Sequence, residues 1–92
     1  MNYQIEKYIR NLFYQAQQGQ CPICLKPLEG KLALDHVHDN TGEPRGLLHQ
    51  RCNMMVAQKE TRTKKLNYII SRQTEERIWN YINNHVKLEV VE

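Results

Sequence analysis

The sequence predicts a small α+β domain whose core is a β-hairpin followed by a helix, with further helices on both sides. Three observations lead to this fold class. The chain has only 92 residues, its middle contains two short strand-like stretches around a turn, and its flanks show the three- and four-residue spacing of helices. We therefore expect one domain over residues 1–92, with an N-terminal helix in 1–19, the core in 20–60 and a helical extension in 61–92.

The first predicted helix spans residues 3–18. Its apolar residues recur at three- and four-residue steps and would form one stripe on the helix surface. They are Ile5, Ile9, Leu12, Phe13 and Ala16. Gly19 can adopt the left-handed backbone conformation that commonly ends a helix. We expect this helix to pack on the core through its apolar stripe.

The core segment begins with Cys21-Pro22-Ile23-Cys24, which predicts a tight turn because Pro22 presets one backbone dihedral. A short strand over residues 31–37 and a returning strand over 45–48 are separated by the turn sequence Asp39-Asn40-Thr41-Gly42. Gly46 in the returning strand permits a bulge, or a close approach by the backbone or a ligand. A helix is expected over residues 51–58. The predicted order is thus strand, turn, strand and helix.

The segment 61–92 is predicted to be a largely helical extension. A short helix is expected near residues 62–71 and a second helix over roughly 74–85. Ser71 or Thr74 can cap the second helix. Alternating apolar residues predict a short strand after it, and these residues are Val86, Leu88 and Val90.

Charge and hydropathy narrow the class of partner. The net charge of +3 is a mild bias towards polyanions. Basic residues from Arg62 to Lys65 could contact phosphates, although such clusters are more often a solvated face. His85 is best explained as a favourable charge at a helix C-terminus. No apolar run approaches the roughly 18 residues that a membrane span needs, and the first residues lack the apolar stretch of a secretory signal. We therefore expect a cytoplasmic protein without a membrane partner.

Two pairs of Cys and His residues enclose the core. Cys21 and Cys24 form one pair, and His49 and Cys52 form a second pair with the same spacing. Three cysteines cannot all pair within one chain, and in a reducing compartment such pairs more often bind metal than form disulfides. Thiolate and imidazole ligands in this pattern are typical of structural zinc. The alternative is three buried or free thiols and a surface His49.

Four motifs within residues 21–53 together resemble the phage recombination endonuclease VII family, a zinc-bearing branch of the His-Asn-His, or ββα-metal, nucleases. They are C-x2-C, L-x-L-D-H-x-H, T-G-x-x-R-G-L-L and H-x2-C-N. The family typically has cysteine where this chain has His49, and zinc accepts this change because imidazole is also a zinc ligand. The resemblance implies a zinc-clasped ββα-metal nuclease core.

The resemblance also implies a role for the polar residues of the core. The positions of Asp35 and Asn53 bind the catalytic ion, that of His36 is the general base, and that of His38 contacts the phosphate. Residue chemistry agrees, because a carboxylate suits a hard ion such as Mg²⁺ or Mn²⁺ and an imidazole titrates near neutral pH. Asn53 could instead orient His36. Arg45 could clamp a backbone phosphate.

This assignment makes a geometric prediction. Strict strand alternation would place Asp35 and His36 on opposite faces of a strand. Both can reach one site only if the strand ends, twists or bulges there, so irregular backbone is expected at residues 35–38. Structural alternatives stay open: Asn53 could cap its helix, His38 could bond to its own loop, and Asp35 and His36 could form a purely structural pair.

The function that these residues favour is a metal-dependent DNA endonuclease. Water activated by His36 would attack phosphorus, and the ion on Asp35 and Asn53 would stabilise the departing 3′ oxygen, leaving a 5′ phosphate. The resemblance points to DNA metabolism in a phage-infected bacterial cell, with junction DNA as a typical substrate. Junction cutters act as homodimers because two strands must be cut, but the sequence is nearly as compatible with a simple nicking enzyme. The rivals are a non-catalytic zinc module that binds nucleic acid or protein, and a redox or zinc-responsive regulator.

Overall fold

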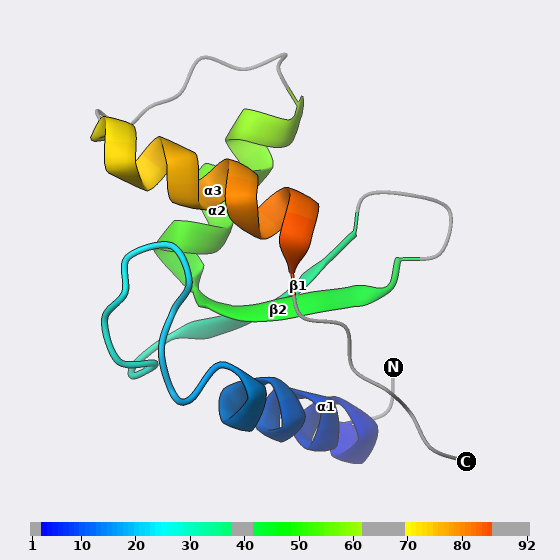
Figure 1. Ribbon diagram of the computed structural model, residues 1–92. Coiled ribbons are helices and arrows are strands. Elements are labelled where there is room, and N and C mark those ends of the chain that lie inside the picture. Colours follow the sequence, from blue (N-terminus) through cyan, green and yellow to red (C-terminus); the bar gives the residue numbers. More distant parts are fainter. Residues whose placement is uncertain (1–2, 38–41, 62–69, 86–92) are drawn as a thin grey trace.

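A computed structural model describes residues 3–37, 42–61 and 70–85. A two-stranded hairpin lies between helix α1 on one side and helices α2 and α3 on the other (Figure 1). The elements are α1 (Tyr3–Ala16), β1 (Leu32–His36), β2 (Pro44–His49), α2 (Gln50–Thr61) and α3 (Arg72–Asn84). This arrangement confirms the predicted α+β class, with a hairpin and helix at the centre and helices on both flanks.

Helix α1 follows the predicted segment closely, but only part of its apolar stripe is buried. Phe13 is fully buried and Ile9 packs against the core, whereas Ile5 is 54% exposed. The helix ends in a Schellman motif, in which the N–H of Gly19 donates to the Tyr14 carbonyl and that of Gln18 donates to the Gln15 carbonyl. Gln18 and Gly19 both have positive φ, so the turn away from the helix begins one residue before the predicted stop.

The hairpin is antiparallel and has one irregularity. Leu32 pairs with His49 and Asp35 pairs with Gly46, but His36 pairs with Pro44. Arg45 is therefore an extra, unpaired residue on β2. One extra residue on one strand of an antiparallel pair defines a β-bulge. The register shift falls between Asp35 and His36. The extra residue lies on β2, opposite the start of residues 35–38, and irregular backbone within 35–38 itself stays a prediction.

Helices α2 and α3 also confirm their predictions, with small differences at the ends. Helix α2 is longer at both ends than the predicted 51–58. Helix α3 is capped by Ser71, whose Oγ accepts a hydrogen bond of 3.1 Å from the Thr74 N–H. His85 follows α3, as expected, and its Nδ1 lies 3.4 Å from the Ile82 carbonyl oxygen. The cluster Arg62–Lys65, nearly all of the helix predicted near residues 62–71, and the strand predicted after α3 lie outside the described residues.

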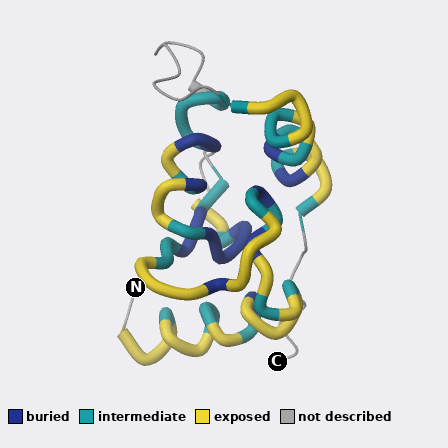
Figure 2. The backbone as a smooth tube through the Cα atoms, turned by 90° about the vertical axis from the view of Figure 1, so that its left-hand side faces the viewer, coloured by how far each residue is buried: buried dark blue, intermediate teal, exposed yellow. Residues whose placement is uncertain are grey.

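The core lies where the hairpin meets the three helices and the cysteine turn (Figure 2). It contains apolar residues of every element together with two cysteines. Its fully or nearly buried members are Phe13, Cys21, Ile23, Leu28, Leu34, Leu47, Leu48, Cys52, Met55, Val56, Ile78 and Tyr81. Among the helices that the structure describes, none combines the length and apolar character needed to cross a membrane.

Candidate metal centre and active site

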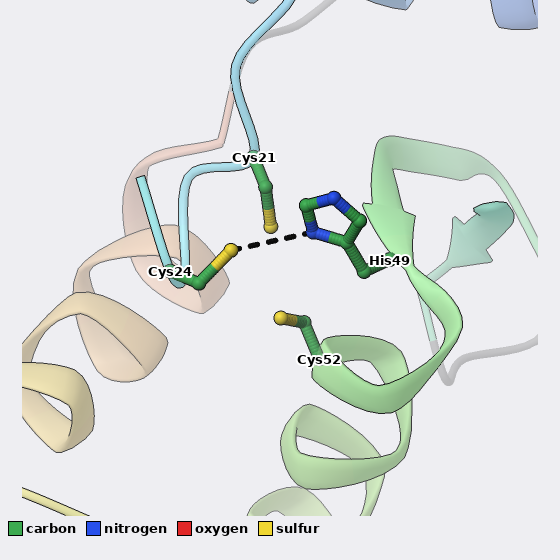
Figure 3. Close-up of side chains that lie close together, drawn as sticks. All are labelled: Cys21, Cys24, His49 and Cys52. Carbon is green, nitrogen blue, oxygen red and sulfur yellow. Dashed lines mark hydrogen bonds between the residues drawn. The ribbon is translucent and has the colours of Figure 1, made fainter. Parts of the chain in front are cut away.

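The two Cys and His pairs meet at the end of the hairpin where β1 begins and β2 ends. Their side chains converge on one point (Figure 3). The four possible ligand atoms, three sulfurs and one imidazole nitrogen, all lie within 4.8 Å of one another. Cys21 and Cys24 come from the turn after α1, His49 ends β2 and Cys52 lies in the first turn of α2. The predicted ligand set is therefore brought together from three parts of the chain.

Backbone hydrogen bonds shape the cysteine turn. The Leu25 N–H donates to the Cys21 carbonyl at 2.9 Å, and the Cys21 N–H donates to the Lys26 carbonyl at 3.0 Å. Leu25 has a φ of 65°, which reverses the chain immediately after Cys24. These bonds hold the turn folded back on itself, so both sulfurs face the same side.

The imidazole of His49 is oriented as a metal ligand. Its Nδ1 lies 3.3 Å from Cys24 Sγ, and its Nε2 lies 2.9 Å from the Pro27 carbonyl oxygen. A carbonyl can only accept, so Nε2 carries the hydrogen and Nδ1 presents a lone pair towards the sulfurs. A backbone carbonyl that fixes the tautomer in this way is the usual partner of a metal-bound histidine. This geometry supports His49 as the fourth ligand.

The thiols influence one another strongly because they are close together and two of them, Cys21 and Cys52, are buried. The pKa of Cys21 is lowered because its sulfur accepts hydrogen bonds from the Cys52 thiol and from backbone N–H groups. The pKa of Cys52 is raised because its thiol donates to Cys21, because it is buried, and because negative charge on the other two sulfurs lies close to it. A divalent cation among the sulfurs would favour thiolate at all three cysteines. Three soft sulfurs and one imidazole suit zinc, and none of the three cysteines forms a disulfide.

A second cluster of charged groups surrounds Asp35, further along the hairpin. Asp35 is only 4% exposed. Its Oδ2 accepts a hydrogen bond of 2.7 Å from Arg45 Nε and another of 2.7 Å from the Tyr81 hydroxyl. The other end of the Arg45 guanidinium makes a bidentate pair with Glu60, at 2.9 and 2.7 Å. We call Asp35, Arg45, Glu60 and Tyr81 the Asp35 network; it joins both strands to α2 and α3.

Burial and charge act together in the Asp35 network. Burial disfavours the charge on Arg45, but its hydrogen bonds to Glu60 and Asp35 outweigh burial and raise its pKa. Burial also raises the pKa of Tyr81, and the negative charge of Asp35 adds to the increase. Among the described residues, every buried side-chain nitrogen and oxygen has a hydrogen-bond partner. The buried nitrogens and oxygens of the network are therefore all bonded, with Arg45 charged and Tyr81 neutral.

Gly46 makes room for the Tyr81 ring. A Cβ atom on Gly46 would lie 2.5 Å from the Tyr81 hydroxyl oxygen and 2.8 Å from a ring carbon. Real Cβ atoms do not come so close to other heavy atoms. The sequence left room at Gly46 for a bulge, the backbone or a ligand. In the structure a side chain of α3 occupies this space, and its hydroxyl thereby reaches Asp35.

The structure places the predicted catalytic residues as follows. Asp35 is buried and His36 is half-buried on the other side of the register shift. Asn53 is half-buried within the first turn of α2, which begins at Gln50, so the alternative that Asn53 caps this helix is wrong. His38 lies outside the described residues. Arg45 is 2% exposed and its nitrogens bind carboxylates, so its predicted contact with a phosphate stays a prediction that would require these ion pairs to open.

Sequence reasoning missed Glu60 and Tyr81. Neither residue belongs to a sequence motif. Tyr81 lies three residues after Ile78 on the apolar face of α3, so its burial could have been predicted from helical spacing. Its hydroxyl partner could not, because Asp35 is 46 residues away in the chain.

Comparison with known proteins gives one match. The sequence model of a family described as recombination endonuclease VII matches residues 1–81. No curated protein and no solved structure gives a significant match. The family match includes α1, the metal-ligand cluster and the hairpin, and it extends through α3 as far as Tyr81.

Proposed function

Because the chain belongs to the recombination endonuclease VII family and is thereby an endonuclease that acts on DNA, we propose that it hydrolyses phosphodiester bonds by the His-Asn-His mechanism, with a divalent ion beside His36. The observation that carries the proposal is the register shift between Asp35 and His36. A β-bulge increases the local twist of the hairpin, and β1 ends at His36. A strand that twists or ends at this point is what two consecutive side chains need to reach one site.

In the proposed reaction His36 acts as the general base. It takes a proton from the water that attacks phosphorus, a role suited to an imidazole because its pKa lies near the working pH. Asp35 and Asn53 supply a carboxylate and an amide oxygen, the donors that Mg²⁺ and Mn²⁺ prefer. The bound ion would stabilise the charge that develops on the departing 3′ oxygen. Cleavage then leaves a 5′ phosphate, with His38 in contact with the scissile phosphate.

The Cys21, Cys24, His49 and Cys52 cluster is proposed to hold a structural zinc ion. All four coordination positions come from the protein, which leaves none for water or substrate and argues against a catalytic role. Cys52 and Asn53 are adjacent on α2, while His49 ends the strand that pairs with Asp35. Zinc would therefore fix the start of α2, and with it Asn53, against the hairpin.

The family implies a junction-resolving enzyme. We propose branched DNA as the substrate, cut by a homodimer in a phage-infected bacterial cell, with a nicking monomer as the alternative mode of action. The two modes differ in products: a resolving dimer makes paired cuts in opposite strands of a four-way junction, whereas a monomer makes single nicks.

A supercoiled-plasmid assay with Mg²⁺ or Mn²⁺ tests the proposal, with a four-way junction and a linear duplex assayed in parallel. Wild-type protein is expected to nick the plasmid. His36→Ala is expected to fold, retain zinc and lose activity by roughly 10²–10⁴-fold, the range for a general base. If wild-type protein is inert with both ions on all three DNA substrates, or if His36→Ala is as active as wild type, the proposed mechanism is wrong.

A further inference from the structure

The carboxylate of Asp35 is held by two donors from different elements, and both bind the same oxygen, Oδ2. We infer that Tyr81 and Arg45 are positioning residues of the nuclease site, which orient Asp35 so that its Oδ1 binds the divalent ion. This inference rests on the proposed function. It makes α3 a part of the active site, where the sequence suggested only a flanking helix.

The charges of the Asp35 network suit a site that receives a cation. Asp35 and Glu60 are negative, Arg45 is positive, and Tyr81 is a neutral hydroxyl donor. One negative charge thus remains in a buried region once Glu60 and Arg45 are paired. A second cationic donor in the place of Tyr81 would cancel this charge and repel a divalent ion. The hydroxyl instead orients the carboxylate and leaves its charge available.

The orientation of the Arg45 guanidinium is fixed by carboxylates on two of its sides. Glu60 binds the two terminal nitrogens, which leaves Nε for Asp35. The Tyr81 ring lies beneath the guanidinium, with 5.4 Å between the Arg45 Cζ and the ring centroid. Arg45 is also the extra residue of the bulge. The bulge opposite Asp35 and His36 therefore supplies one of the two donors to Asp35.

The position of the Tyr81 hydroxyl is equally constrained. The ring is only 5% exposed and fits over Gly46, where a Cβ atom would collide with it. Ile78, one turn earlier on α3, is fully buried in the core. Arg77 Nε donates a hydrogen bond of 2.6 Å to the Ile23 carbonyl, which joins α3 to the cysteine turn. Because packing holds the Tyr81 ring in place, its hydroxyl is preorganised to orient the Asp35 carboxylate.

The decisive variant is Tyr81→Phe, which removes one oxygen and keeps the ring over Gly46 and beside Arg45. Direct binding of Mn²⁺ to zinc-loaded protein, followed by the electron paramagnetic resonance signal of free Mn²⁺, is the primary measurement. We expect roughly 10-fold weaker Mn²⁺ binding, the lower end of the range for loss of a group that orients a metal ligand. The Mn²⁺ concentration for half-maximal plasmid nicking should rise by a similar factor, with activity recovering at higher Mn²⁺. Zinc content should not change.

Tyr8→Phe is the matched control, because it removes the same atom from a side chain that is 64% exposed on α1. It should leave Mn²⁺ binding and nicking unchanged. Glu60→Gln weakens the ion pair that orients Arg45 and so acts on Asp35 indirectly. It should weaken Mn²⁺ binding by at least about 3-fold, less than the roughly 10–100-fold typical for loss of a group that orients a metal ligand directly. It also replaces Tyr81→Phe as the deciding variant if that protein does not fold with zinc.

Two outcomes would overturn the inference in different ways. If wild type binds Mn²⁺, Asp35→Asn abolishes this binding, and both Tyr81→Phe and Glu60→Gln bind as wild type does, the positioning role is wrong while the proposed function stands. If wild type binds no Mn²⁺ that depends on Asp35, the proposed metal site and the positioning role fall together.

Discussion

The Cys and His cluster and the Asp35 network are both groups of buried or half-buried ionisable side chains, but their charges are neutralised in different ways. The cluster gathers three sulfurs and one imidazole within 4.8 Å, so it requires an added cation to be stable with its thiols ionised. The Asp35 network contains its own cation, Arg45, and a neutral donor, Tyr81. The cluster can therefore exist as a clasp only with metal, whereas the network can form before any catalytic ion arrives.

The two groups are placed to stabilise different parts of the hairpin. The Cys and His cluster lies at the end of the hairpin where β2 meets α2, and the Asp35 network joins the bulge to α2 and α3. A chain of this length buries only a small core, so its stability is marginal. We therefore expect loss of the clasp to unfold the protein and loss of the network to damage a domain that still binds zinc.

The largest predicted effect is that of removing zinc. Structural zinc contributes on the order of 10 kcal/mol to folding, as much as the whole stability of a typical domain, about 5–15 kcal/mol. Chelation, or Cys52→Ser, should abolish cooperative thermal unfolding measured by circular dichroism. His49→Cys is the control, because it keeps four zinc ligands and should keep both metal and fold. Cooperative unfolding of chelated wild type would show that the clasp is not essential.

The second prediction tests whether the Asp35 network carries its own neutralising charge. Arg45→Met leaves two carboxylates, Asp35 and Glu60, without their common partner, and should lower the free energy of unfolding by about 3–5 kcal/mol. Denaturant unfolding of zinc-loaded protein measures this loss, and zinc content should be preserved. Arg72→Met is the control, since the Arg72 side chain is 91% exposed beside Glu76 and such pairs contribute little. Equal effects of the two substitutions would mean that Arg45 does not neutralise the carboxylates of the Asp35 network.

The third prediction concerns the fit of α3 against the hairpin. Gly46→Ala should cost about 1–3 kcal/mol, as overpacking usually does, because the new methyl group meets the Tyr81 ring. The cost should largely disappear in a Tyr81→Ala background, where the ring is absent. A double-mutant cycle of denaturant unfolding measures this coupling. If Gly46→Ala costs the same in both backgrounds, the glycine serves the strand and not the tyrosine.

The same contrast explains what the sequence could and could not predict. The metal-ligand cluster was predicted with all four residues, because its ligands lie in two short pairs and zinc geometry demands such spacing. The hairpin, α1 and α3 followed from periodicity and turn chemistry, and Ser71 was one of two residues expected to cap α3. The Asp35 network joins residues from four elements without any fixed spacing, so Glu60 and Tyr81 carried no local signal. Arg45 was expected to clamp a phosphate, and because arginine is rarely fully buried, nothing in the sequence indicated its two carboxylate partners.

The smallest predicted effect concerns alkaline pH and depends on Tyr81 alone. Burial and the charge of Asp35 raise the pKa of Tyr81 above its usual value of about 10, which it regains in the unfolded chain. A raised pKa in the folded state means that folding favours the protonated hydroxyl. This contribution to stability is complete below about pH 10 and is lost as the pH rises above it, by up to about 1.4 kcal/mol per pH unit.

The measurement is the free energy of unfolding of zinc-loaded protein between about pH 9 and 11. Tyr81→Phe has no hydroxyl to ionise at this position, so its free energy of unfolding should fall less steeply with pH than that of wild type. The two slopes should differ by up to about 1.4 kcal/mol per pH unit. Tyr8→Phe should keep the wild-type slope, since its hydroxyl is on the exposed surface of α1. Groups that titrate alike in all three proteins cancel in the comparison. Parallel curves for wild type and Tyr81→Phe would mean that the hydroxyl of Tyr81 is not held in a buried bond to Asp35 in solution, which would remove the basis for its positioning role as well.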